Sequence, residues 1–327
     1  FPDDQINDYE NSFNSQVEYT HYTLAVPNEQ MQLKLSGNYL LKVYDSENTQ
    51  EPVFQKSFSV AEPSPINVQT SVRTLPLAGN APCSQQLNFS VEHPSFTIQQ
   101  PYTELKVRVT QNGYRFVQQP HPTPTFVKND AVDFSDFNKN LYTGSSEYRS
   151  FDVSTLEYKT LRVRDIALDN NQFQVRVAED LPFKQYIFSN DMNGRYFIRN
   201  QLYTDESEYR SEYPNVYLSL HMEQPLKGKV YVFGELSSWE LSNDFVMLYN
   251  AARQAYEVTL PLKQGYYDYK YVYVDENGKL DLGKFDGCSS EAENTYGIYV
   301  YYRGTTDRHD RLLNATYINS MGNLEKQ

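Results

Sequence analysis

Most of this chain alternates apolar and polar residues with a period of two. The pattern is clear in residues 17–26, 31–37 and 38–45, and returns near the end in residues 266–274 and 296–304. Successive side chains of a β-strand point to opposite faces, so this alternation predicts half-buried strands. The 29 Tyr and 18 Phe residues favour the same structure, since aromatic residues are enriched in strands. The predicted fold class is therefore all-β.

The length and the punctuation of the pattern predict three domains. A chain of 327 residues exceeds one ordinary sandwich. Prolines 63 and 65 and the acidic stretch 204–214 interrupt the strand pattern. We expect an N-terminal β domain over residues 1–62, a central β-sandwich over 63–206 and a C-terminal domain over 207–327. The strand and turn spacing indicates tandem immunoglobulin-like, early-set sandwiches, the last resembling a glycogen-binding-type sandwich.

The hydrophobic cores of these sandwiches should form from inward-facing residues of the strands. Burial of each aliphatic member is expected to contribute on the order of 1.5–3 kcal/mol. The expected core residues are Leu40, Val43, Phe89, Val107, Val163, Val175, Val232 and Tyr271.

Charge and hydropathy exclude several classes of partner. The 29 basic and 42 acidic residues give a net charge of −13, which repels nucleic acid and anionic lipid. No apolar run is long enough to span a bilayer, and no signal peptide is visible. The abrupt start at Phe1 suggests a trimmed fragment. Cys83 and Cys288 fall in different predicted domains and define no disulfide framework.

The sequence carries no recognisable catalytic or metal-binding motif. The five histidines are too widely spaced to suggest a metal pair. Residues 275–281, DENGKLD, fail the spacing of a calcium loop and fit a hairpin turn around Asn277-Gly278. We predict no enzyme, no cofactor and no metal; a hydrolase using paired carboxylates is a weak third alternative.

Two groups of aromatic residues are candidate contacts for a partner or a glycan. Trp239 lies in a predicted loop, where an exposed indole could stack on a sugar or a peptide, although a buried structural role is favoured. Tyr267 and Tyr269 belong to an alternating ladder that places four tyrosines on one face of a strand. Cross-strand packing is the simpler explanation of that ladder.

A longer irregular segment, residues 118–142, is the second candidate contact region. It contains three prolines and no sustained period, and ordered domains rarely keep such a loop without a use. Its candidate contact residues are Phe126, Phe134 and Phe137.

Several strings together resemble the type IX secretion system plug family. They occur in the family's order and extend from about Tyr19 to Gly304. The strings are YTHYTLAVPN, LKLSGNYLLKVYD, QNG, SSEYRSFD, YIFSNDMNGRYF, LKQGYYDYKY and ENTYGIYVYYRG. Members of that family begin with a signal sequence and further strands, so we expect the first domain here to be truncated at its start.

The resemblance implies a non-enzymatic protein of the Bacteroidota envelope. It implies a periplasmic location at the outer membrane, where the protein would close the periplasmic end of a large translocon barrel, its suspected partner. The family supplies no catalytic residues to carry over. The alternative is a carbohydrate-binding β-sandwich protein, which requires Trp239 and a tyrosine to be exposed side by side.

Overall fold

The computed structural model describes residues 4–63, 65–78, 81–113, 121–136, 139–183 and 186–322. The chain is mostly β-strand, so the predicted all-β class is confirmed. The helices of this part of the chain are short, such as α1 (Pro101–Glu104) and α2 (Ser207–Arg210). No helix in the described ranges is long and apolar enough to cross a membrane. Neither cysteine is a free thiol.

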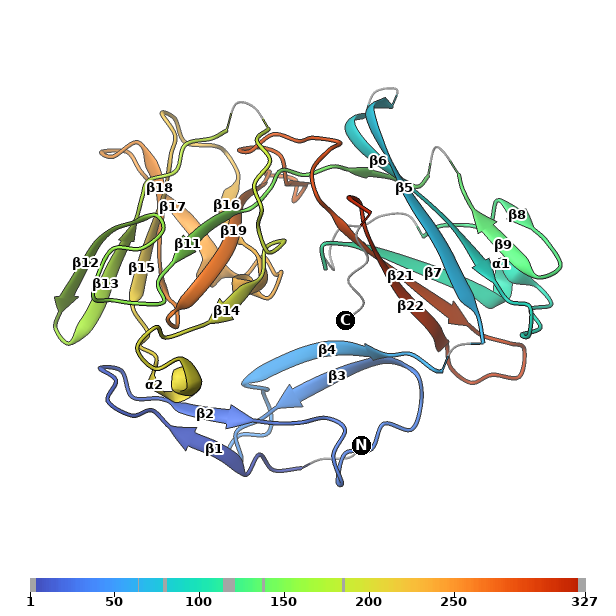
Figure 1. The fold of residues 1–327 in the computed structure, drawn as a ribbon, viewed down its shortest axis with the longest axis horizontal. Helices are drawn as coiled ribbons and strands as arrows, with labels where there is room; N and C mark the ends of the chain where they lie inside the picture. Colours follow the sequence, from blue (N-terminus) through green and yellow to red (C-terminus); the bar gives the residue numbers. More distant parts are fainter. Residues whose placement is uncertain are drawn as a thin grey trace. The chain divides into compact units, whose positions relative to one another are not determined.

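The chain forms two compact units, each built from segments far apart in the sequence (Figure 1). The first unit comprises the residues up to Val26 together with Ser145–Glu293. The second comprises Pro27–Gly144 and the residues from Asn294 onward. These units differ from the predicted succession of domains 1–62, 63–206 and 207–327. Strands on both sides of the predicted boundary near residue 207 pair with one another.

The first unit contains one large sheet and a separate hairpin. The hairpin pairs β1 (Asp8–Asn11) with β2 (Thr20–Thr23). The sheet order is β11-β19-β16-β17-β18-β15-β13-β12, with β14 and β20 also paired to β19. Its strands are β11 (Arg149–Asp152), β12 (Val163–Asp169), β13 (Gln172–Val177), β14 (Tyr196–Ile198), β15 (Asn215–His221), β16 (Lys229–Phe233), β17 (Val246–Asn250), β18 (Ala255–Pro261), β19 (Gly265–Val274) and β20 (Leu280–Asp281).

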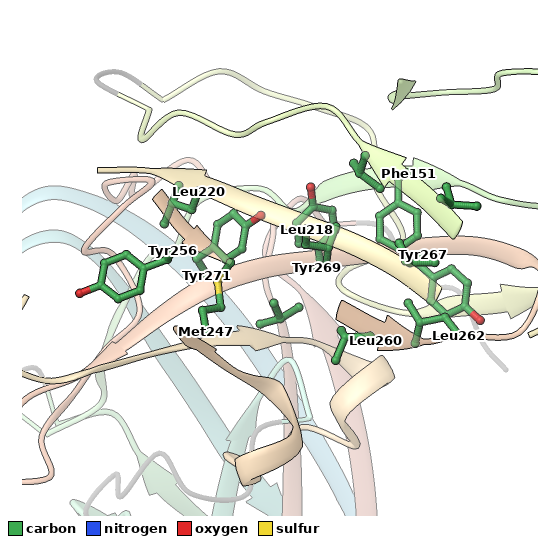
Figure 2. Packing of buried hydrophobic residues seen from close by; sticks show 14 of the residues in the cluster. Phe151, Leu218, Leu220, Met247, Tyr256, Leu260, Leu262, Tyr267, Tyr269 and Tyr271 are labelled. Atoms are coloured by element: carbon green, nitrogen blue, oxygen red, sulfur yellow. The ribbon is translucent and has the colours of Figure 1, made fainter. Parts of the chain in front are cut away.

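This sheet curls around a single hydrophobic core. Phe151 of β11 and Val163 of β12 come from its two ends, yet both belong to one buried cluster. Tyr267, Tyr269 and Tyr271 extend from β19 into the same cluster, among aliphatic residues of the neighbouring strands (Figure 2). The inward face of β19 is thus aromatic because its rings fill the interior of the curled sheet.

The second unit contains two sheets and a hairpin. The first sheet has the order β10-β6-β9-β8, with β5 also on β6, and the second has the order β22-β21-β7. The hairpin pairs β3 (Gly37–Val43) with β4 (Phe54–Val60). The sheet strands are β5 (Asn67–Ala78), β6 (Ala81–Glu92), β7 (Leu105–Gln111), β8 (Phe126–Val127), β9 (Ala131–Phe134), β10 (Leu141–Thr143), β21 (Thr295–Tyr302) and β22 (Arg311–Asn319).

Residues of both sheets share the core of the second unit, as in a β-sandwich. Phe89 of β6 and Phe134 of β9 stack at 4.8 Å between ring centroids, and Val107 of β7 and Ile298 of β21 join the same buried cluster. The hairpin β3–β4 contributes little to this core. Leu40 is exposed there and Val43 is half-buried, so the prediction of a core position is wrong for Leu40.

Candidate functional site

The two tyrosines predicted as contacts are part of the core. Tyr267 is 2% exposed and Tyr269 is fully buried, so the prediction of a partner or glycan contact is wrong for both. Phe151 of the paired strand β11 stacks on Tyr267 with the ring centroids 5.4 Å apart. Cross-strand packing therefore explains the alternating tyrosines of residues 266–274. The opposite face of β19 is also buried, through Asp268 and Lys270.

Trp239 is half-buried and packs against aromatic neighbours. Its ring meets Phe233 edge-on at 5.6 Å and Tyr148 at 6.2 Å between centroids. Gly194 lies beneath the indole, since a Cβ at this glycine would come within 2.5 Å of Trp239. These contacts support the structural role of the tryptophan, and with Tyr267 and Tyr269 buried the sugar-stacking pair is not assembled.

Part of the predicted contact loop over residues 118–142 forms short strands of a sheet. Within it β8 pairs with β9, and β9 pairs with β6. Phe126 is exposed, whereas Phe134 is 1% exposed and stacks on Phe89, so Phe134 is not available as a contact. Phe137 lies outside the described residues. The prolines interrupt the alternating pattern, so these short strands were not predicted from the sequence. The apolar residues Val132 and Phe134 anchor the strands in the core.

The structure instead presents a buried ionic network at the start of β11. Arg149 donates to Asp180 at 2.6 Å and to Asp286 at 2.5 Å, and the three side chains are 1–2% exposed. Arg162 donates to the same oxygen of Asp180 at 2.7 Å. Burial alone would lower the pKa of Arg149, but the carboxylates of Asp180 and Asp286 raise it above its ordinary value. The guanidinium therefore stays charged.

Two core tyrosines complete this network. Tyr269 and Tyr271 donate their hydroxyls to Asp180 Oδ2 at 2.7 and 2.8 Å. Burial, together with the neighbouring carboxylate, raises the pKa of both phenols well above the usual value. Each keeps its proton, as donation to Asp180 requires. The hydroxyl groups of Tyr269 and Tyr271 thus fix the position of the Asp180 carboxylate, which also accepts from Arg149 and Arg162.

A pocket of about 360 Å³ lies beside this network. We call it the Arg149 pocket, and its walls include Glu147, Arg149, Arg162, Phe183, Ile187 and Asp286. Phe183 lies over the Arg149 guanidinium at 3.9 Å from the ring centroid. Tyr186 donates its hydroxyl to Glu147 at 2.5 Å at another wall.

The mouth of the pocket carries large exposed apolar side chains. We call these residues the apolar rim: Leu161, Phe183, Ile187 and Phe188. Ile187 is 73% exposed, far more than an isoleucine of a core strand. An apolar cluster bordered by charged groups is typical of a surface that binds another molecule.

Several polar atoms in the walls lack partners. Asp286 Oδ2, Ser146 Oγ and the Nε atoms of Arg149 and Arg162 are buried without a hydrogen bond within the part of the chain that the structure describes. All four residues line the Arg149 pocket. The backbone of Arg162 also has φ of 61°, a left-handed conformation that a residue with a side chain rarely adopts. Unmet polar atoms and backbone strain gather at binding sites.

A second polar group lies on the outer face of β19. Lys270 donates to Ser145 Oγ at 2.7 Å and lies 4.0 Å from the centre of the Tyr148 ring. Asp268 accepts from Ser150 at 2.7 Å and from the backbone N–H of Met192. Burial raises the pKa of Asp268 to about 6, despite these hydrogen bonds. Burial also raises the pKa of Asp191.

Sequence reasoning missed the Arg149 pocket because its residues come from five separate segments. The detectable sign was the apolar content of residues 181–188, LPFKQYIF, between the strand β13 and a turn at Asn193-Gly194. Such side chains in a connection are either buried or available to a partner. The pairing of Arg149 with Asp180 and Asp286 depends on the tertiary fold and has no local pattern.

Comparisons with known proteins identify related sequences and structures. Residues 1–62 match the family model described as the type 9 secretion system plug protein 1st domain, which confirms the resemblance predicted from the sequence. The whole fold is similar to the crystal structure of a hypothetical protein from Parabacteroides merdae ATCC 43184. The identity is 29% and the TM-score 0.89, and the match covers 96% of this chain and 79% of that chain. No curated protein matches the chain.

Proposed function

Because residues 1–62 carry the first domain of the type IX secretion system plug family, we propose that the chain is a non-enzymatic plug of an outer-membrane protein translocon. The domain match associates the chain with type IX secretion and with the cell envelope. In the proposed role the protein binds the periplasmic end of the translocon barrel and closes it sterically. Closing a channel needs a docking surface and no chemistry.

The apolar rim of the Arg149 pocket supports a protein-binding role. Leu161, Ile187 and Phe188 expose large apolar areas around one pocket of the first unit, in two connections outside the regular strands. The anchors of protein interfaces are apolar groups of this size surrounded by polar residues. A sugar site would favour exposed aromatic faces, yet two of the rim residues are aliphatic and the predicted tyrosines are buried.

The proposal is tested by recovering the partner from native outer membranes. The tagged chain is expressed in its host and purified with a salt wash, and the bound proteins are identified by mass spectrometry. We expect a very large outer-membrane barrel protein. A clean preparation that instead binds a glycan array would overturn the plug proposal in favour of the carbohydrate-binding alternative.

A matched pair of variants makes the test specific to the rim. Ile187→Asp places a charge on a residue that is 73% exposed, and Val53→Asp does the same at a residue that is 74% exposed in the other unit. We expect Ile187→Asp to reduce the recovered barrel by about tenfold or more, as for an interface anchor, and Val53→Asp to leave it unchanged. Loss of closure should also let large antibiotics enter cells that carry the Ile187 variant.

A further inference from the structure

The Arg149 pocket has a polarity that selects among possible occupants. Arg149 donates to Asp180 and Asp286, and Arg162 donates to Asp180. The positive charges of both arginines are therefore already paired with carboxylates inside the protein. The unmet charged atom is Oδ2 of Asp286, whose side chain is 1% exposed. Its Oδ1 accepts from Arg149, whereas Oδ2 has no donor in the described ranges. A buried carboxylate oxygen without a donor is costly, and a positively charged donor compensates it most strongly.

The other unmet atoms require hydrogen-bond acceptors. Arg149 and Arg162 each leave an Nε–H without a partner among the described residues, and the hydroxyl of Ser146 is also unmatched. Main-chain carbonyl oxygens of a peptide would accept from such N–H groups. A single segment of protein chain can therefore supply both a cationic side chain and the acceptors.

The surroundings of the pocket favour the same occupant. The net charge of −13 attracts basic partners over long distances. The apolar rim would pack against the apolar neighbours of the inserted side chain, as Leu161 and Ile187 offer no polar groups. Phe183 is already stacked on Arg149, which gives the pocket an aromatic wall.

We propose that the Arg149 pocket receives a lysine or arginine side chain of a partner protein, flanked by apolar residues, with its cationic group donating to Asp286. This inference rests on the proposed function, because the translocon would supply the segment. It identifies the chemistry of the contact: a basic residue inside an apolar stretch at the surface of the barrel.

The test uses the full chain and short synthetic peptides. Acetylated, amidated peptides of sequence Ala-Leu-X-Phe-Ala are labelled with a fluorophore and titrated with the protein by fluorescence polarisation, with X as Lys, Arg, norleucine, Gln or Glu. We expect Lys and Arg to bind at least about tenfold more tightly than norleucine, and Glu to bind most weakly. Equal binding of all five peptides, or binding of none at about 1 mM, would overturn the inference.

Two variants assign the selectivity to the pocket. Asp286→Asn should remove most of the preference for Lys over norleucine, while Asp165→Asn, at an exposed position of β12, should keep it. Because Asp286 also supports Arg149, the fluorescence of Trp239 is compared first to show that the variant is folded. The comparison of the five peptides on the unmodified chain needs no variant.

The outcome is separable from that of the plug proposal. Recovery of a barrel protein without any charge selectivity would leave the plug role standing and refute this contact. Charge-selective peptide binding without recovery of a barrel would refute the plug role and keep a site for basic protein segments. Displacement of the peptides by a neutral oligosaccharide would refute the peptide assignment.

Discussion

The guanidinium of Arg149 donates to the carboxylate of Asp180 at 2.6 Å, where both side chains are almost fully enclosed. Tyr269 and Tyr271 hold the other oxygen of that carboxylate from β19. The hydrophobic core and the wall of the Arg149 pocket are thus joined through a single carboxylate. Changes to this network should alter stability as well as binding.

Replacing Arg149 by Ala should strongly destabilise the first unit. Asp180 and Asp286 would lose their buried counter-ion, and removal of one partner of a buried ion pair costs about 3–5 kcal/mol. Urea unfolding followed by Trp239 fluorescence measures the loss within the same unit. Arg164→Ala, at an exposed position of β12, should change stability by less than about 0.5 kcal/mol. Equal stability of the Arg149 variant and the unmodified chain would contradict a stabilising role for these ion pairs.

Gly194 should resist substitution for steric reasons beyond its backbone conformation. Its φ is 81°, and a Cβ there would lie 2.4 Å from Tyr148 and 2.5 Å from Trp239. Gly278 has a nearly equal φ of 78°, but a Cβ added to it would meet nothing within 4 Å. Gly278→Ala therefore isolates the backbone cost, roughly 1 kcal/mol, whereas Gly194→Ala should cost more and shift the tryptophan emission. Similar melting temperatures for the two variants would count against this packing.

The stability of the first unit should fall as the pH rises between about 4 and 6. Burial raises the pKa of Asp268 from 3.8 to about 6, so between these values the folded state binds more protons than the unfolded state. The contribution of Asp268 is then most favourable below pH 3.8 and is lost as the pH rises to 6. Asp191 shifts in the same direction through burial.

Asp268→Asn removes this titration. We expect the fall in unfolding free energy between about pH 4 and pH 7 to be smaller in the variant by an amount on the order of 1–3 kcal/mol. Urea unfolding at several pH values measures the slope. An unchanged slope of unfolding free energy against pH would show that groups other than Asp268 cause the pH dependence.

The ion pair of Glu62 with Arg311 should contribute modestly to the second unit. Arg311 donates to both carboxylate oxygens, at 2.8 and 2.6 Å. These hydrogen bonds lower the pKa of Glu62, so its contribution is present above the unfolded pKa and is lost on acidification. Both groups are partly exposed, so Glu62→Gln should cost at most about 1 kcal/mol at neutral pH. The exposed Glu47→Gln serves as the control, and high salt should narrow the difference.

Local alternation was enough to predict the all-β class and many of the strands. Val107, Val175 and Val232 lie in the cores as predicted, because a strand with one buried face imposes a period of two. The prediction did not extend to β19, where Asp268 and Lys270 are buried on the second face. Alternation describes a strand with one covered face and cannot indicate that both are covered.

The candidate site depended on contacts that no local pattern contains. Arg149, Asp180 and Asp286 come from three different segments of the first unit, and their meeting depends on the curled sheet. Trp239 and Tyr269 attracted attention as contacts because they are aromatic, yet large rings are as often used to fill an interior. Aromatic content alone therefore did not separate surface from core.

The pairing of β7 with β21 also determines when the second unit can fold. β7 begins at Leu105 and β21 at Thr295, and β21 lies between β7 and β22 in their sheet (Figure 1). During synthesis β7 must remain without its partner until nearly two hundred further residues have been added. Contacts of such sequence separation form slowly and leave strand edges open to aggregation. A ribosome that stalls before β21 would therefore release a polypeptide that depends on chaperones for its solubility.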